Sequence, residues 1–228
     1  QLVSPKTKLI AVTYVSNVLG NIQPVKEIIN IAKSVNALTL IDAAQAASHF
    51  PIRVNELDCD FLTLSAHKML GPSGVGVLYG KYDALESLDV YRKGGGMINL
   101  FSDSQQVVKE VPERFEAGTP NIGGAIGLGA AVDWLACIGM DAIAAYEHEL
   151  LHDAVTRLES IDRITLIGTP TSRAGAISFV VDGMHPADIG AMLDRHGIAV
   201  RAGHHCAQPI LERFGLKSTV RIAPAMYN

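Results

Sequence analysis

The sequence lacks a strong charge of either sign and lacks any long apolar run. Its 228 residues include 19 lysines and arginines against 23 aspartates and glutamates, a formal net charge of −4. This weakly acidic balance offers no electrostatic footprint for nucleic acid or for an anionic membrane. No apolar run approaches the ~18–20 residues of a membrane-spanning helix. Neither nucleic acid nor a membrane is therefore expected as a partner, and 48% hydrophobic with 18% charged residues indicates a globular protein.

Cysteine is also scarce. The three cysteines are Cys59, Cys137 and Cys206, and they cannot all pair with one another. None lies in a CxxC or zinc-type spacing, and Cys206 with the adjacent His204 and His205 lacks a fourth ligand at a usual distance. We therefore expect no metal site and a reduced, cytoplasmic location.

Strands alternate with helices in the first part of the chain. Short apolar, β-branched runs predict strands, and the apolar spacing after Pro24 predicts a helix. Such alternation favours an α/β fold with a mostly parallel sheet. The predicted strands are residues 8–16, 37–41, 60–65 and 74–79, and the predicted helix is 24–33.

The second part of the chain has a different pattern. Residues 97–112, after three glycines, are predicted to be a loop, and 122–138 a helix buried nearly all round that Gly139 breaks. A charged helix over 141–158 then precedes a strand, strand, helix, strand pattern. This shift predicts part of a large domain over residues 1–139 and part of a smaller α+β domain over 140–228. The later elements are predicted at 164–167, 176–181, 187–196 and 198–201.

Polar side chains follow three of the predicted strands, at the edge where open α/β sheets bind ligands. They are Asn17 after the first strand, Asp42 and Gln45 after the second, and Ser65, His67 and Lys68 after the third. Taken singly, an aspartate there is most often a cap and a lysine a solvated loop residue. Together they describe a pyridoxal 5′-phosphate site, which needs a lysine to bind the cofactor covalently and an acid on its ring nitrogen.

Cys206 differs in its surroundings from the other two cysteines. Cys59 and Cys137 are each expected to be small buried hydrophobic residues. Cys206 instead follows Arg201, His204 and His205, although adjacent histidines can also simply cap a loop. Nearby positive charge favours the nucleophilic thiolate, so Cys206 is the candidate nucleophile.

Five motifs in order resemble a known family. They are Val15–Gly20, Ile41–Gln45, Ser65–Pro72, Arg114–Asn121 and Arg201–Ala207. Together they resemble the group II cysteine desulfurases (Suf-type desulfurases and selenocysteine lyases) of the class V aminotransferase family. The resemblance covers nearly the whole chain. It implies the fold type I of pyridoxal phosphate-dependent transferases, a homodimer, and conversion of L-cysteine to L-alanine with an enzyme persulfide for iron–sulfur cluster assembly or other sulfur delivery to an acceptor protein.

The resemblance also implies a role for each matching position. Lys68 matches the Schiff-base lysine and Cys206 the sulfur-accepting cysteine. The other positions match residues that contact the cofactor or the substrate. The cofactor contacts implied are Asp42 with the ring nitrogen, Gln45 with the ring oxygen, Ser65 and His67 with the phosphate, and Thr119 with the phosphate of the opposite subunit. The substrate contacts implied are those of Asn17, Arg201 and Arg221.

Two alternatives and one expectation accompany this interpretation. A selenocysteine lyase would use the same residues, and a non-catalytic scaffold would not need Lys68, Asp42 and Cys206 intact. The family also has an upstream part with a ring-stacking histidine and a Gly-Thr phosphate loop, and a C-terminal helix, that find no match within the chain. We therefore expect residues 1–228 by themselves to bind the cofactor weakly and to be inactive.

Overall fold

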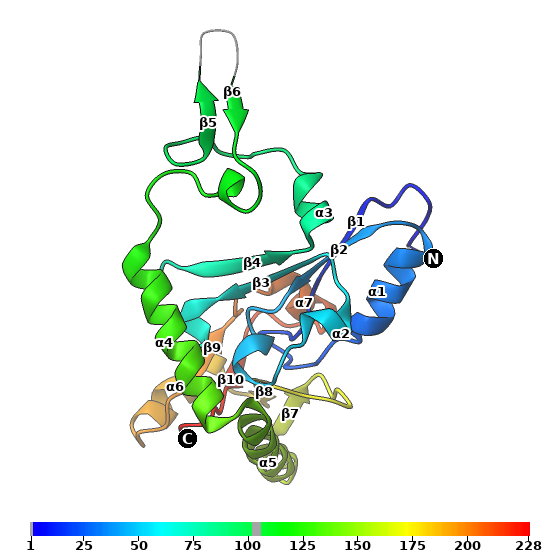
Figure 1. The fold of residues 1–228 in the computed structure, drawn as a ribbon. Coiled ribbons are helices and arrows are strands. Elements are labelled where there is room, and N and C mark those ends of the chain that lie inside the picture. Colours follow the sequence, from blue (N-terminus) through cyan, green and yellow to red (C-terminus); the bar gives the residue numbers. More distant parts are fainter. Residues whose placement is uncertain (1, 102–105) are drawn as a thin grey trace. The chain divides into compact units, whose positions relative to one another are not determined.

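A computed structural model describes residues 2–101 and 106–228, which form two compact units (Figure 1). Over the described residues, unit 1 comprises residues 2–12, 25–44, 53–101 and 106–137, and unit 2 comprises Thr13–Pro24, Gln45–Ile52 and Ile138–Asn228. The chain thus enters unit 2 twice before it completes unit 1. The division into domains at Gly139 stays a prediction, because compactness does not show which parts fold independently.

Unit 1 is built on a four-stranded sheet in the order β1-β2-β3-β4. The strands are β1 (Leu9–Thr13), β2 (Leu38–Asp42), β3 (Phe61–Ser65) and β4 (Gly76–Gly80). Strands β2 and β3 are parallel, whereas β4 runs antiparallel to β3. The α/β prediction is confirmed, with an antiparallel strand on one edge that the sequence pattern did not reveal.

The helices of unit 1 follow from local sequence. Helix α1 (Val25–Ser34) buries Val25, Ile29 and Ala32, which lie on one face at a spacing of three to four residues. Pro24 directly precedes it, where a missing N–H costs no helical hydrogen bond. The shorter helices are α2 (Val54–Leu57), α3 (Tyr82–Glu86) and the 3₁₀ turns η2 (Ala66–Lys68) and η3 (Glu113–Phe115).

The predicted loop over residues 97–112 is wrong in part. Strands β5 (Ile98–Phe101) and β6 (Gln106–Val108) pair antiparallel there as a hairpin (Figure 1). Residues 102–105 lie outside the described part of the chain. Each strand is short and contains a polar residue, so the segment carries the composition of a loop although its backbone pairs.

Helix α4 (Ile122–Ile138) has the predicted bounds but not the predicted burial. Only Gly124, Leu128 and Leu135 are buried, whereas Ile126 and Trp134 are 70% and 53% exposed. Gly139 ends the helix with φ +95°, as expected of the residue that breaks it. In the described part of the chain no single helix is both long enough and apolar enough to span a bilayer.

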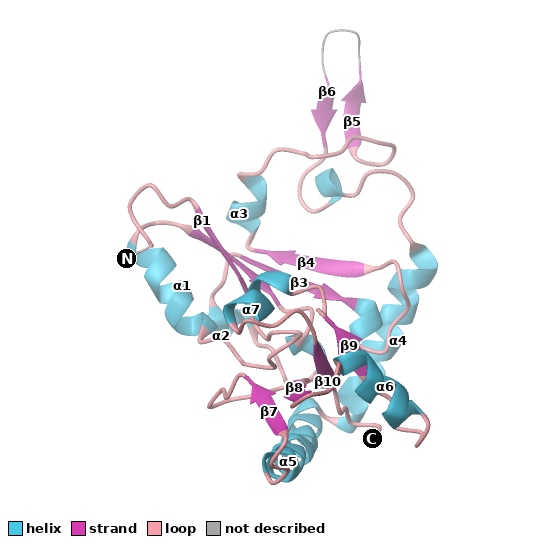
Figure 2. Ribbon diagram, turned by 180° about the vertical axis from the view of Figure 1, so that it is seen from behind, coloured by secondary structure: helices cyan, strands magenta, loops and turns pink. Residues whose placement is uncertain are grey.

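Unit 2 contains a wholly antiparallel sheet in the order β7-β8-β10-β9. Its core is formed by Phe179, Ile189 and Val220, one from each of two strands and a helix. Figure 2 shows helix α6 beside β9 and β10, and these elements are in contact. The elements are α5 (Met140–Glu159), β7 (Ile164–Ile167), β8 (Ile177–Val181), α6 (Pro186–Asp194), β9 (Arg201–Gly203), α7 (Gln208–Arg213) and β10 (Thr219–Ile222), with the turn η1 (Ala46–Ser48).

Most predicted elements of unit 2 are confirmed within two or three residues. The strand predicted at residues 198–201 is displaced, because β9 begins only at Arg201. Its partner β10 fixes this register by pairing Arg221 with Arg201 and Thr219 with Gly203. The displacement moves the strand to the residues that lead into Cys206.

Candidate functional site

The first group of predicted site residues lies at one edge of the unit 1 sheet. Asp42 ends β2 opposite Thr63 of β3, and the ladder continues one residue further, where the Ala43 N–H donates to the Thr63 carbonyl at 2.9 Å. Because the strands are parallel, their carboxyl ends meet at the same edge. Asp42 is thereby brought beside the end of β3, and the turn η2 carries the rest. We call Asp42, Ser65, His67 and Lys68 the lysine cluster.

The side chains of the lysine cluster leave reactive groups uncommitted. One carboxylate oxygen of Asp42 accepts the Ala44 N–H at 2.9 Å, which fixes the side chain. Ser65 Oγ and His67 Nδ1 are 2.9 Å apart and hydrogen-bonded. Lys68 is half-buried, and among the described residues it makes no hydrogen bond or ion pair. The ends of β2 and β3 therefore present an available amine, a fixed carboxylate and two hydrogen-bonding groups at one edge of the sheet.

Gln45 and Thr119, the two other predicted cofactor residues, have surroundings of their own. Gln45 belongs to unit 2, where it precedes the turn η1 and its carbonyl accepts the Ser48 hydroxyl at 3.3 Å. Thr119 lies exposed in the loop before α4. The cofactor roles of both residues stay predictions.

The second group of predicted residues lies in unit 2 and centres on two arginines. Arg201 of β9 and Arg221 of β10 are directly opposite each other in the antiparallel pair. Opposite residues share a face of a sheet, and like charges placed there repel. The two arginines, with Ala199, Val200, Ala202 and Ala223, line an open pocket of about 620 Å³. Such a pocket suits an anion, whose charge would offset the repulsion.

Arg221 is held rigidly but retains an unsatisfied donor. Its Nη1 donates to the Asn17 carbonyl at 2.8 Å, while its Nε is buried and has no hydrogen-bond partner among the residues that the structure describes. Burial lowers the pKa of Arg221, and the neighbouring charge of Arg201 lowers it further. A planar guanidinium with a free donor matches a carboxylate. The arrangement therefore favours a substrate that carries a carboxylate.

Cys206 belongs to the same group. It is exposed, and it lies close enough to Arg221 for the two to interact electrostatically. Its N–H donates to His204 Nδ1 at 3.0 Å, so one of the two histidines does cap the loop as the alternative interpretation holds. Asn17, Arg201, Cys206 and Arg221 are called the cysteine cluster below.

The other two cysteines have different surroundings from each other. Cys59 is fully buried, which confirms the expectation of a small buried hydrophobic residue, and burial raises the pKa of its thiol. Cys137 contradicts the same expectation, because it is exposed on α4. The reason is that α4 buries only a narrow face, and Cys137 is not on it.

Thr219 is a residue of this site that the sequence analysis did not identify. It is fully buried at the start of β10, and both its carbonyl and its Oγ1 lie 3.1 Å from His205 Nε2. Threonine is common in strands, so the sequence carries no signal that sets it apart. Only its pairing with His205 shows that it belongs to the surroundings of Cys206.

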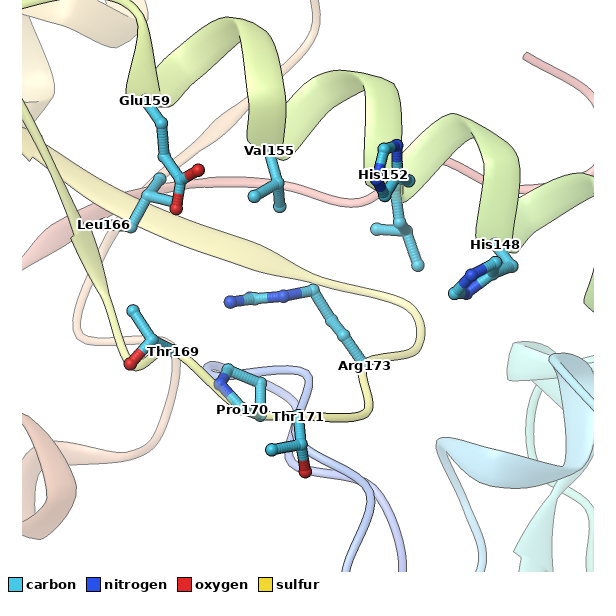
Figure 3. Close-up of a pocket in the computed structure, with 10 residues that line it drawn as sticks. His148, His152, Val155, Glu159, Leu166, Thr169, Pro170, Thr171 and Arg173 are labelled. Carbon is cyan, nitrogen blue, oxygen red and sulfur yellow. The ribbon is translucent and has the colours of Figure 1, made fainter.

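A further pocket in unit 2 runs along α5. It measures about 200 Å³ and is lined by His148, His152, Glu159 and Arg173 among others (Figure 3). The guanidinium of Arg173 donates to the carbonyls of Leu19, Gly168 and Ala176 at 2.8–3.0 Å. Those bonds engage the arginine with the backbone, so it supports the loops that surround it.

A family model and several known proteins match this chain over its whole length. The model of the aminotransferase class-V family matches residues 1–228. A cysteine desulfurase of Synechococcus elongatus is 50% identical over 228 residues, covering all of this chain and 36% of that protein. A cysteine desulfurase of Escherichia coli is 46% identical, covering all of this chain and 56% of that protein. The chain thus spans about a third to a half of the length of these relatives.

Solved structures agree with the sequence matches. The cysteine desulfurase CsdA from Escherichia coli has a TM-score of 0.94 and 36% identity, over all of this chain and 56% of that one. The cysteine desulfurase from Thermococcus onnurineus has a TM-score of 0.93 and 43% identity, over 97% of this chain and 56% of that one. These structural matches and the match to the family model each cover at least 97% of the chain. The chain belongs to the aminotransferase class-V family.

Proposed function

We propose that the protein containing this chain is a cysteine desulfurase that uses pyridoxal phosphate. The observation that carries the proposal is the cysteine cluster, in which two cross-strand arginines form an anion-binding pocket near an exposed thiol. L-Cysteine presents a carboxylate to such a pocket and a sulfur atom to such a thiol. Relatives at 46–50% identity are named cysteine desulfurases, which supports the same activity.

The lysine cluster fits the proposed cofactor. Lys68 has no competing partner in the described part of the chain, and Asp42 is fixed through only one of its two oxygens. Lys68 would hold the cofactor covalently, Asp42 its ring nitrogen, and Ser65 and His67 its phosphate. When bound, pyridoxal phosphate draws electrons from the α-carbon of an amino acid and so activates it for bond cleavage.

The residues of the chain perform the remaining steps. Arg221 and Arg201 bind and orient the carboxylate of L-cysteine, and the Lys68 amine carries the α-proton. The Cys206 thiolate attacks the substrate sulfur, so that a sulfur–sulfur bond forms as the carbon–sulfur bond breaks. The β-carbon gains a proton and L-alanine is released, while the transferred sulfur stays on Cys206 as a persulfide. The two sulfur atoms are oxidised as the β-carbon is reduced, so no outside oxidant is required.

The proposal extends to the partners of the protein. Exposed Thr119 would contact the cofactor phosphate of a second subunit in a homodimer. An acceptor protein would take the sulfur from Cys206, whose exposure leaves the persulfide accessible. A cytoplasmic location stays a prediction from the cysteine content.

The test is sulfur transfer by the full-length protein. With L-cysteine, alanine should form together with a persulfide on the Cys206 peptide, detected by mass spectrometry. Lys68→Ala should lose the visible absorbance of the cofactor. Cys206→Ser should keep that absorbance and lose at least about a hundredfold in rate, because a hydroxyl cannot accept sulfur.

Cys137→Ser is the matched control, since Cys137 is also exposed but lies on α4. This variant should transfer sulfur at the wild-type rate. Persulfide on Cys137 in place of Cys206, or turnover that survives Cys206→Ser, would overturn the proposal.

A further inference from the structure

The turn that carries Cys206 has an unusual backbone. His205 and Cys206 have φ values of +54° and +57°, so two successive residues other than glycine are left-handed. Few non-glycine residues adopt this region, and it persists where surrounding contacts hold it. The conformation of the proposed nucleophile therefore depends on the groups that hold its neighbour.

Two segments of unit 2 hold His205. Its ring Nε2 lies 3.1 Å from both the carbonyl and the hydroxyl of Thr219 on β10. Its carbonyl accepts the Asn17 side-chain N–H at 2.6 Å. Burial and the charge of Arg221 lower the pKa of His205, so the ring is neutral near pH 7. A neutral ring with its proton on Nε2 donates to the carbonyl and hydroxyl oxygens of Thr219 together, which fixes both the ring and the turn.

We propose that His205 and Thr219 are positioning residues that hold the Cys206 turn in its left-handed form and so aim the thiol at the substrate sulfur. The inference rests on the proposed function of Cys206. His205 acts through the turn, by the hydrogen bond of its Nε2 to Thr219, and it needs no contact with substrate or cofactor. The Cys206 thiol is exposed whether or not this bond forms. His205 and Thr219 therefore set the direction in which the thiol attacks and do not change its access to small reagents.

The experiment compares two substitutions of equal length in the full-length holoenzyme. Gln in His205→Gln keeps an N–H donor near the position of Nε2, whereas Met in His205→Met has none. Three rates or signals are measured: persulfide formation on Cys206 in a single turnover with L-cysteine, alkylation of Cys206 by iodoacetamide, and the cofactor absorbance. His196→Met, at an exposed position, controls for the substitution itself.

We expect His205→Met to slow persulfide formation at least about tenfold, because a displacement of about 1 Å between reacting atoms can cost a hundredfold. His205→Gln should stay within about threefold of wild type. Alkylation and absorbance should change less than about twofold in both variants. Equal losses in the Gln and Met variants, or a loss matched by slower alkylation, would overturn the positioning role.

A second pair guards against misfolding of the Met variant. Thr219→Val keeps the shape and the carbonyl but removes the hydroxyl, and should slow persulfide formation about two- to threefold, the effect of one weakened hydrogen bond. Thr219→Ser keeps the hydroxyl and should not. If wild type forms no persulfide on Cys206, the proposed function fails and this inference with it. If wild type does and both Met and Val variants match it, the inference alone fails.

Discussion

At the scale of single residues, His205 is a half-buried imidazole next to positive charge. Burial is the main cause that lowers its pKa below the ordinary value of 6.5, and the charges of Arg221, His204 and Arg201 act in the same direction. The unfolded chain therefore binds a proton on His205 more readily than the folded chain does. Folding stability from this residue is present above pH 6.5 and is lost as the pH falls toward the lower folded pKa.

We expect the urea midpoint of the full-length protein to fall between pH 7 and pH 5, and to fall less in His205→Gln. Glutamine does not titrate, so its variant lacks the proton uptake that accompanies unfolding. His196→Gln, an exposed histidine, should keep the wild-type slope. If the urea midpoint falls equally with pH in wild type and in His205→Gln, His205 does not contribute to the pH dependence of stability.

At the scale of elements, the turn that carries Asn17 is packed tightly against β8. Ser16 Oγ accepts the N–H groups of Val18 and Leu19, which closes the turn. The Val18 carbonyl accepts the buried Ser178 hydroxyl at 2.6 Å. Gly20 ends the turn with φ +70°, and a Cβ there would lie 2.1 Å from the Ala176 carbonyl oxygen. Only glycine satisfies both the backbone angle and the space.

Gly20→Ala should therefore destabilise the full-length protein by about 3 kcal/mol or more, since overpacking alone costs about 1–3 kcal/mol and the positive φ adds to it. The matched control is Gly197→Ala, where φ is +73° but no atom lies within 4 Å of the added Cβ. That variant should lose about 1–2 kcal/mol, the cost of the backbone angle. Thermal or urea unfolding compares the two, and equal losses would contradict the close packing.

At the scale of the molecule, one buried acid joins segments of unit 2 that are far apart in sequence. Glu147 of α5 is 3% exposed. One of its oxygens lies 2.7 Å from His49 Nδ1, and the other accepts the Met226 N–H at 3.0 Å. A single side chain thus connects the segment at residues 45–52, helix α5 and the last residues of the chain.

Glu147→Ala should lower the free energy of unfolding by about 3–6 kcal/mol, because hydrogen bonds to charged groups contribute about 1.5–3 kcal/mol each and two are lost. Glu149→Ala lies two residues further along the same helix and is exposed, so it should change stability by less than about 0.5 kcal/mol. Urea unfolding of both variants in the full-length protein measures the difference. Similar midpoints would mean that Glu147 does not join the segments as described.

Local sequence patterns predicted most helices and strands, but not which of their faces are buried. The spacing of Val25, Ile29 and Ala32 predicted α1, and Gly139 predicted the end of α4. The hairpin of β5 and β6 was missed because pairing between strands is not encoded in the composition of either strand. The prediction that α4 is buried nearly all round was wrong, because an apolar sequence shows which faces of a helix can be buried and not which faces are buried.

The sequence by itself determined the chemistry of the candidate site. It supplied an acid and a lysine after successive strands, and a cysteine among cationic residues, because reactive groups are visible as residue types in a motif order. Tertiary structure alone decided how they are held. The pairing of Arg201 with Arg221 and the bond between His205 and Thr219 depend on the register of β9, β10 and the turn between β9 and α7. Such contacts join residues 14 to 20 positions apart, and their geometry is set by strand pairing that no local pattern specifies.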